Sequence, residues 1–262
     1  MNIVESIILG IIQGLTEFLP VSSSGHIELG KVLLDVHVKD PLLFSIVVHA
    51  ATALSTIVIF FKDILQMIKD LVKFEWNPST QFATMILVSM VPVGIVGILF
   101  EDQINSLFDG NVLLVGAMLL VTGGLLWYSS RAKVTEGELN FPKALIIGIS
   151  QAIAILPGIS RSGSTISTAL LLGVDRATAA SFSFLMVLPP ILGATALKVK
   201  DYFELMGGES GDLAASGFLA AFVSGLIACN WMIRLVRQSK LDYFAIYCFI
   251  VGIIAIVAGL MQ

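Results

Sequence analysis

The chain has 262 residues, of which 56% are hydrophobic and only 13% are charged, whereas soluble domains carry about 25% charged residues. This composition excludes an ordinary soluble domain, and we expect a single all-α integral membrane domain over residues 1–262. The net charge of −4 excludes the basic surface that nucleic acids require, so no nucleic-acid partner is expected.

The predicted elements form the same succession twice. An apolar stretch over about 3–34 is interrupted by QGLTEFLPVSSSGH at 13–26. Three apolar runs follow, each close to the roughly 17–25 residues that a transmembrane helix takes. A second interrupted stretch, about 142–173, contains QAIAILPGISRSGS at 151–164, and three more runs follow it. The six predicted spans are 42–61, 81–100, 112–128, 180–198, 213–233 and 243–260.

The two interrupted stretches predict re-entrant helical hairpins. Apolar arms of about 9–13 residues rise only about 14–20 Å as helices, whereas the hydrocarbon core is about 30 Å thick. Each stretch should therefore enter the membrane and return to the same side. Non-helical backbone at that depth is tolerated only where protein or a water-filled cavity covers it. Residues 3–19 alone are long enough to span, which leaves a spanning helix as the alternative for the first hairpin.

The second half of the chain repeats the first. Four positions match at a constant offset of 138, namely Gly10, Gln13 and Ser24-Gly25 with Gly148, Gln151 and Ser162-Gly163. Each repeat, about 1–130 and 140–262, would hold one hairpin and three spans. Because three crossings are an odd number, the second repeat should enter from the opposite face. Such inverted-topology repeats place their site near the midplane, between broken helices.

Lysine and arginine residues are enriched in cytoplasmic loops. In the predicted arrangement one side holds only Lys31, Lys39, Lys198 and Lys200. The other side holds ten basic residues, namely Lys62, Lys69, Lys73, Arg131, Lys133, Lys143, Arg176, Arg234, Arg237 and Lys240. The richer side is predicted to be cytoplasmic. Both termini and the mouth of the first hairpin would then face outward.

Gln13 and Glu17 lie four residues apart, on one helix face just before Pro20. A charged side chain at membrane depth costs about 2.5–3.5 kcal/mol on insertion scales and indicates a functional site by default. The alternative is that Glu17 forms a buried, purely structural ion pair with Arg161.

The first tip contains Ser22, Ser23, Ser24, Gly25 and His26. Serine is a preferred N-cap residue, so at least one of these side chains should cap the following helix. The N-terminus of a helix also offers free N–H groups to an anion. A hydroxyl, a histidine and a nearby carboxylate are the parts of an activated nucleophile.

The second tip contains Ser160, Arg161, Ser162, Gly163 and Ser164. The planar guanidinium of Arg161 matches a phosphate or carboxylate group, and a second helix begins directly after it. Two helix starts and one arginine predict a phosphate cradle. The spacing of a Walker motif is absent, which argues against a nucleotide.

His49 lies in the middle of the first predicted span. A lone membrane histidine of this kind is expected to pack between helices. The alternative is that it lines the same cavity as the two tips.

The segments GLTEFLPVSSSGH and LPGISRSGSTIS together resemble the undecaprenyl pyrophosphate phosphatase family, also called bacitracin-resistance proteins. The resemblance covers essentially the whole chain, including FSFL and GATAL after the second tip. It implies a multi-pass enzyme of the bacterial cytoplasmic (inner) membrane. Such an enzyme removes the terminal phosphate of undecaprenyl diphosphate outside the cytoplasm, and so recycles the lipid carrier of peptidoglycan synthesis.

The resemblance also implies roles for individual residues. The family's tip serine, essential histidine and arginine fall on Ser23, His26 and Arg161, and its second acidic position falls on Glu17. Gln13 occupies a position that is Glu or Gln in the family, and an amide there cannot act as a carboxylate base or a charged metal ligand. The residues expected to bind the substrate phosphates are Gln13, Ser22, Ser24, Gly25, Ser160, Ser162, Gly163 and Ser164.

The expected mechanism is attack of Ser23 on the terminal phosphorus, with His26, tuned by Glu17, taking the serine proton. Attack by His26 itself is the alternative. Arg161 and the two helix N-termini would stabilise the charge on the phosphoryl oxygens. A divalent cation, Mg²⁺ or Ca²⁺, is expected to bridge diphosphate oxygens, with Glu17 as its protein ligand.

The expected partners are a polyprenyl diphosphate lipid and the membrane, with a homodimer left open. The competing class of function is a lipid-carrier flippase or an anion transporter, because inverted repeats with broken helices are common among transporters. The discriminating feature is His26 with Glu17 beside a hydroxyl, which transport of an anion does not need.

Overall fold

The computed structural model describes residues 1–33, 41–107, 111–133, 136–198 and 209–261. Within these ranges the regular structure is helical, and the one β-bridge, between Gly137 and Val174, is isolated. The expectation of an all-α chain is therefore confirmed. Lys39 and Lys200, which were assigned to the side poorer in basic residues, lie outside the described residues.

Five helical segments are long and apolar enough to cross a membrane, and α3 counted together with α4 makes a sixth. This confirms an integral membrane protein with several spans. The segments are α5 (Pro78–Leu99), α7 (Val112–Ser130), α10 (Arg176–Leu185) with α11 (Leu188–Leu197), α13 (Glu209–Arg237) and α14 (Asp242–Met261), with α3 (Pro41–Ile59) and α4 (Phe61–Val72) as the bent pair.

Two of the predicted spans differ in detail. The helix axis turns by 81° between the α3 and α4 segments, at Phe60, so the span predicted over 42–61 continues into a second helix. The span predicted over 180–198 is divided between α10 and α11, and α11 begins next to Pro189. A proline lacks the N–H of the helical ladder and restricts the residue before it, which explains the division. The short helix α6 (Glu101–Ser106) was not predicted.

Four short helices flank the two tips, namely α1 (Ile3–Phe18), α2 (Ser23–Leu33), α8 (Phe141–Ile153) and α9 (Arg161–Leu171). Both tips turn through a left-handed residue, Ser22 with φ 72° and Gly158 with φ 97°. Both following helices begin with a serine hydroxyl that accepts a backbone N–H, Ser22 from Gly25 and Ser160 from Gly163. The predicted capping by tip serines is therefore confirmed.

Each short helix before a tip packs against a long helix through a glycine. Gly10 of α1 lies against the carbonyl oxygen of Gly217 in α13, and Gly148 of α8 lies against the carbonyl oxygen of Ser89 in α5. A Cβ atom at either glycine would overlap that oxygen. Small residues allow this close approach of helices in membranes. The two glycines are the matched positions of the sequence repeat, so corresponding positions make the same kind of contact.

The largest buried apolar cluster lies behind the tips and joins the end of α1 to α10. Phe18 of α1 and Phe184 of α10 meet edge to face, with their ring centroids 5.5 Å apart, a favourable arrangement of aromatic rings. Because Glu17 precedes Phe18 and Ser183 precedes Phe184, this contact fixes where the polar groups next to the cluster lie.

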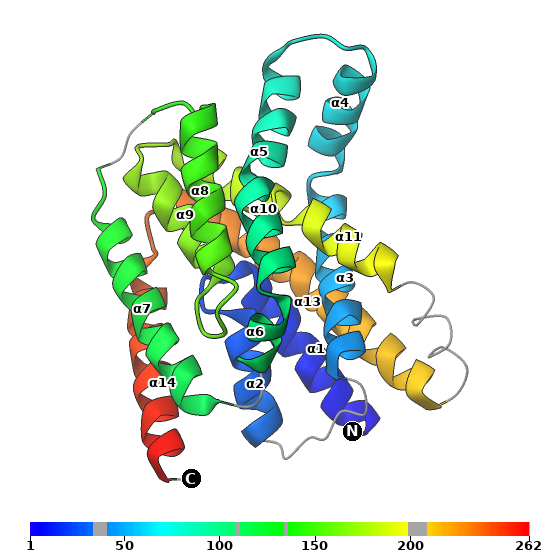
Figure 1. Cartoon of the computed structure of the whole chain (residues 1–262), viewed down its shortest axis with the longest axis vertical. Helices are drawn as coiled ribbons and strands as arrows, with labels where there is room; N and C mark the ends of the chain where they lie inside the picture. The colour runs from blue at the N-terminus through cyan, green and yellow to red at the C-terminus, as the bar shows by residue number, and fades with distance from the viewer. Residues whose placement is uncertain (34–40, 108–110, 134–135, 199–208, 262) are drawn as a thin grey trace.

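The two termini lie at one end of the molecule, near the ends of α1 and α14, while the α4–α5 loop lies at the opposite end (Figure 1). Between these ends α11 crosses α3 (Figure 1).

Gly148 should tolerate no side chain, because the Ser89 carbonyl occupies the space. We expect Gly148→Ala to lower the free energy of unfolding by about 1–3 kcal/mol, the usual effect of overpacking. Thermal unfolding of the purified protein in detergent measures this. Gly94→Ala is the matched control on α5, since nothing lies within 4 Å of a Cβ built there. Equal effects of the two substitutions would contradict the proposed contact.

Candidate active site

The two tips meet at Glu17, the last but one residue of α1. Its Oε1 accepts a hydrogen bond from Nη2 of Arg161 at 2.5 Å. Its Oε2 accepts from the hydroxyl of Ser23 at 2.8 Å and from the amide Nε2 of Gln13 at 3.0 Å. The residue is only 7% exposed. The structure therefore brings together four residues that the sequence analysis selected from both halves of the chain.

Arg161, the first residue of α9, is held from two sides. Besides the ion pair with Glu17, its Nη1 donates to the carbonyl oxygen of Ser183 at 2.9 Å. Thr165, one turn along α9, bonds through its hydroxyl to the Arg161 carbonyl and to the Ser183 hydroxyl. The guanidinium has five N–H groups, so this anchoring leaves others available for an anionic ligand.

His49 of α3 belongs to the same cluster. Its Nε2 lies 3.7 Å from Oε2 of Glu17, and its Nδ1 lies 2.7 Å from the carbonyl oxygen of Ser45. A carbonyl oxygen only accepts, so Nδ1 carries a proton and Nε2 faces the carboxylate. The sequence analysis expected helix packing at this position, and the structure instead supports the alternative that His49 lines the polar site.

His26 of α2 points toward α14 rather than toward Ser23. Its Nδ1 lies 2.8 Å from the carbonyl oxygen of Ser22, and its Nε2 lies 2.8 Å from the hydroxyl of Tyr247. Because the carbonyl only accepts, Nδ1 donates to Ser22 and the tyrosine hydroxyl donates to Nε2. The described contacts give Ser23 no hydrogen bond to His26. In this arrangement Glu17 is the hydrogen-bond acceptor of the Ser23 hydroxyl.

Tyr247 is the functional candidate that the sequence analysis missed. It lies inside the last apolar run, and its ring is nearly parallel to that of His26, with an angle of 15° and a centroid distance of 5.6 Å. A phenol within a span needs a hydrogen-bond partner, and this requirement is the signal that would have identified it.

Several serines that were expected to bind phosphate make bonds within the protein. Ser160 caps α9 through its hydroxyl, and its backbone N–H donates to the hydroxyl of Thr122 at 3.0 Å. Ser162 donates to the carbonyl oxygen of Leu19 at 3.3 Å. These bonds fix the shape of the second tip and fasten it to the first. Ser22 and Ser24 lie 3.4 Å apart at their hydroxyls, and Ser164 is buried.

Both glycines expected at the phosphate site lie in crowded surroundings. Gly25 faces the Cα of Gly158, so the backbones of the two tips lie close together, and Gly163 faces the side chain of Ser160. These glycines allow the close approach of the tips. Their surroundings consist of protein atoms, so their role in the structure is packing.

The matched glutamines of the two repeats are both buried and both incompletely bonded. Among the described residues, Oε1 of Gln13 and both amide atoms of Gln151 have no hydrogen-bond partner. Buried polar atoms are usually paired, with water or a ligand where protein is lacking. The Gln13 oxygen lies on the residue that bonds Glu17, so it is available to a group bound at the site.

The described residues do not form a preassembled metal site. No group of three or more His, Cys, Asp or Glu residues within the described ranges is placed to hold a metal ion. Both oxygens of Glu17 already accept hydrogen bonds from Arg161, Ser23 and Gln13. The protein alone therefore offers few free oxygen ligands to a cation, chiefly Oε1 of Gln13.

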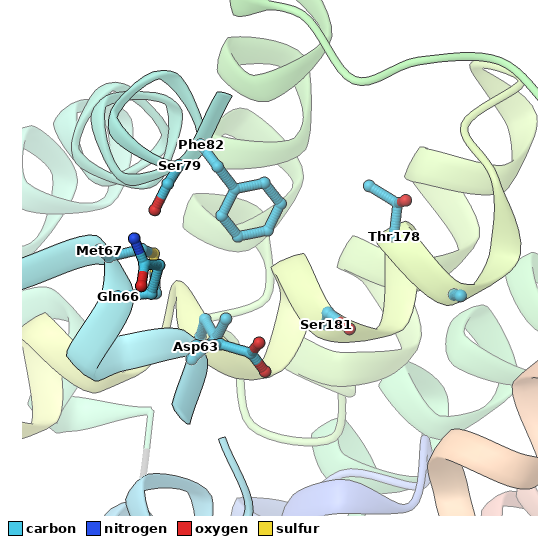
Figure 2. A pocket seen from close by; sticks show the side chains of 9 residues that line it. Asp63, Gln66, Met67, Ser79, Phe82, Thr178 and Ser181 are labelled. Atoms are coloured by element: carbon cyan, nitrogen blue, oxygen red, sulfur yellow. The ribbon is translucent and has the colours of Figure 1, made fainter. Parts of the chain in front are cut away.

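Two cavities differ in their relation to this cluster. The larger, of about 470 Å³, lies between α4, α5 and α10, and its lining includes Asp63, Gln66 and Thr178 (Figure 2). None of its lining residues belongs to the tips. The smaller, of about 220 Å³, lies between α3 and α11 and is lined by His49. Only the smaller cavity therefore shares a residue with the polar cluster.

Comparison with known proteins identifies the family of the chain. The sequence model of the family described as "Bacitracin resistance protein BacA" matches residues 6–254. A protein named undecaprenyl-diphosphatase from Christiangramia forsetii is 56% identical over the full length of both chains. Proteins of the same name from Bacteroides fragilis and the archaeon Methanosphaera stadtmanae are 51% and 38% identical, over at least 98% of each chain. The chain therefore belongs to the bacitracin resistance protein BacA family.

Proposed function

We propose that this protein is an integral-membrane phosphatase that hydrolyses undecaprenyl diphosphate to undecaprenyl phosphate and inorganic phosphate. The observation that carries the proposal is the contact between the two tips, in which the Ser23 hydroxyl donates to Glu17 and Glu17 pairs with Arg161. A hydroxyl beside a carboxylate and a guanidinium is suited to phosphoryl transfer. The full-length relatives carry the name of that activity.

In the first step, Ser23 Oγ forms a bond to the terminal phosphorus while the bond from that phosphorus to the bridging oxygen breaks. Undecaprenyl phosphate leaves with the electron pair of that bond. Glu17 accepts the serine proton, because its Oε2 already lies 2.8 Å from the hydroxyl. General base catalysis requires this hydrogen-bond distance. The geometry thus favours Glu17 over His26 as the base for this step.

In the second step, a water molecule attacks the phosphoserine, and the P–O bond to Ser23 breaks to release phosphate. We assign the water's proton to His26, whose Nε2 is an acceptor in the tautomer fixed by Ser22. The Tyr247 hydroxyl lies 2.8 Å from that nitrogen and orients the ring. It must give up this position to the attacking water, or to phosphorus if His26 were itself the nucleophile. The leaving Ser23 oxygen takes back the proton that Glu17 accepted in the first step, which restores both groups.

Arg161 has two anionic partners under this proposal. It pairs with Glu17 through Nη2, and its remaining N–H groups bind the terminal phosphate of the substrate. The ion pair that the sequence suggested is present. Under this proposal it is more than structural, because it joins the general base, Glu17, to the residue that binds the phosphate, Arg161. Backbone N–H groups at the starts of α2 and α9 add positive potential at the same place.

The two tips and their flanking helices support re-entrant hairpins in an inverted repeat. Helices α8 and α9 have 13 and 11 residues, which is about 17–20 Å of rise against a core of about 30 Å. The equivalent contacts of Gly10 and Gly148 support the pairing of the repeats 1–130 and 140–262.

We further propose that the site opens to the outer face of the bacterial cytoplasmic membrane, with both termini outside. The excess of lysine and arginine on the opposite side supports this orientation. The product would re-enter peptidoglycan and cell-wall synthesis as the lipid carrier. The mass of the purified protein in detergent distinguishes a homodimer from a monomer.

A lipid-carrier flippase or anion transporter is the second candidate, favoured by the repeated architecture with broken helices. It would use the same Arg161 and serines. It gives no reason for a serine hydroxyl to donate to a carboxylate. Release of inorganic phosphate by purified protein in detergent, where no membrane separates two compartments, distinguishes hydrolysis from transport.

Removing the nucleophile or its base should abolish most turnover. We expect Ser23→Ala to reduce phosphate release from undecaprenyl diphosphate to background, and Glu17→Gln to lower kcat by about 10²–10⁴-fold. A colorimetric phosphate assay on purified variants measures both. Ser150→Ala on α8, which removes a hydroxyl that donates to the Ile147 carbonyl oxygen within its own helix, is the control and should retain activity. Near-normal turnover by Ser23→Ala would exclude the serine mechanism.

The hydrogen bond from Tyr247 should affect catalysis through His26. We expect Tyr247→Phe to lower kcat by roughly 3–10-fold, in line with one net hydrogen bond. In ¹⁵N-histidine NMR spectra, Nδ1 should stay protonated while the Nε2 shift of His26 changes. Tyr243→Phe, one turn earlier on α14, is the matched control and should change neither. An unaltered His26 spectrum in Tyr247→Phe would refute the contact.

A divalent cation, Mg²⁺ or Ca²⁺, should accompany the diphosphate, because the permanent cation Arg161 is already paired with Glu17. The protein oxygens that would hold such an ion are Oε1 of Gln13, which has no hydrogen-bond partner, and a carboxylate oxygen of Glu17, which would have to exchange one of its present hydrogen bonds. We expect EDTA to lower phosphate release by about tenfold or more, with recovery on adding Mg²⁺ or Ca²⁺. Unchanged turnover in EDTA would remove the cation from the proposal.

A further inference from the structure

The cavity between α3 and α11 begins at the polar cluster. It has a volume of about 220 Å³, and its walls come from Ser45, Ile46 and His49 of α3 and from Pro190, Ile191, Ala194 and Thr195 of α11. Nε2 of His49 also lies 3.7 Å from Oε2 of Glu17. His49 therefore belongs both to the cavity wall and to the polar cluster in which Glu17 bonds Ser23 and Arg161.

The cavity offers an apolar surface to a ligand. Ile46, Pro190, Ile191 and Ala194 supply hydrocarbon, and the two hydroxyl-bearing residues on the walls bond within their own helices. Thr195 donates to the Ile191 carbonyl at 2.8 Å, and the Ser45 hydroxyl lies 3.3 Å from Nδ1 of His49. The polar group at the inner end is therefore His49, and the remaining wall suits a hydrocarbon chain.

Helix α11 also carries exposed apolar side chains. Leu192 and Leu197 are 46% and 86% exposed, and exposed apolar side chains on a spanning segment are expected to contact acyl chains. A ligand in the cavity would thus lie next to the charged cluster at one end and next to apolar side chains and lipid at the other. This matches an amphipathic molecule with an anionic head and a long apolar tail.

We propose that the α3–α11 cavity binds the first isoprene units of the substrate and leads the polyprenyl chain from the reaction centre into the membrane. The proposal rests on the proposed phosphatase function and adds to it a binding subsite for the chain. His49 is the boundary residue between the site for the diphosphate and the site for the chain. Ala194 has the smallest side chain on the α11 wall, so a larger residue at this position would narrow the cavity.

The test compares two substrates with the same head and different tails, undecaprenyl diphosphate and geranyl diphosphate. Ala194→Trp should fill the cavity and lower kcat/KM for undecaprenyl diphosphate by on the order of tenfold or more. Geranyl diphosphate has only two isoprene units, so it loses much less chain contact than undecaprenyl diphosphate when the cavity is filled, and its kcat/KM should change much less. Leu192→Trp, on the exposed side of the same helix, is the matched control and should leave the ratio of the two substrates unchanged.

Ile46→Trp fills the cavity from the α3 wall and gives the same comparison where Ala194→Trp does not fold. Retained turnover of geranyl diphosphate shows that a variant is folded and that the phosphatase function holds. Equal losses on both substrates in both variants, or unchanged kcat/KM for undecaprenyl diphosphate, would overturn the chain subsite. Failure of the wild-type protein to release phosphate from either substrate would instead overturn the proposed function itself.

Discussion

A carboxylate buried in a membrane protein needs a compensating charge, and here that need determines the arrangement of both halves of the chain. Glu17 is almost fully buried and pairs with Arg161, a residue 144 positions further along. Breaking such a buried pair by removing one partner typically costs about 3–5 kcal/mol. The two tips must therefore meet, and the helices that carry them must bring them to the same depth.

The packing around this pair meets that requirement with small residues and aromatic rings. Glycines at matched positions of α1 and α8 allow each helix to lie directly against the backbone of a long helix. The contact of Phe18 with Phe184 then fixes the end of α1 against α10, beside the carbonyl that anchors Arg161. The polar groups of the site are few. Glu17 and Ser183 are each positioned by the aromatic residue that follows them in the chain.

The helical membrane fold and the four central residues were predictable because both depend on local pattern. Long apolar runs and charges within them are visible in a single sequence, so Glu17 and Arg161 could be selected before the structure, with Gln13 on the same helix face as Glu17. Ser23 was singled out among the tip serines by the family resemblance. Residues that acquire a role only through tertiary packing were harder to predict. Tyr247 and Thr122 lie in ordinary apolar runs, and only the crossing of α14 and α7 with the tips gives them a role. The direction of His26 likewise depends on the rotation of α2, which the sequence does not specify.

The separation of Glu17 from Arg161 along the chain has a consequence for biogenesis. The carboxylate is synthesised and inserted long before its cation exists, since every residue of the first repeat precedes Arg161. The nascent first half would therefore hold a buried acid without its counter-charge until the second tip is synthesised. Arg161 of the second tip supplies that charge, so the late half of the polypeptide fixes the position of the early half. A ribosome-bound fragment that ends before residue 140 would contain the nucleophile yet lack the ion pair that keeps it in the bilayer.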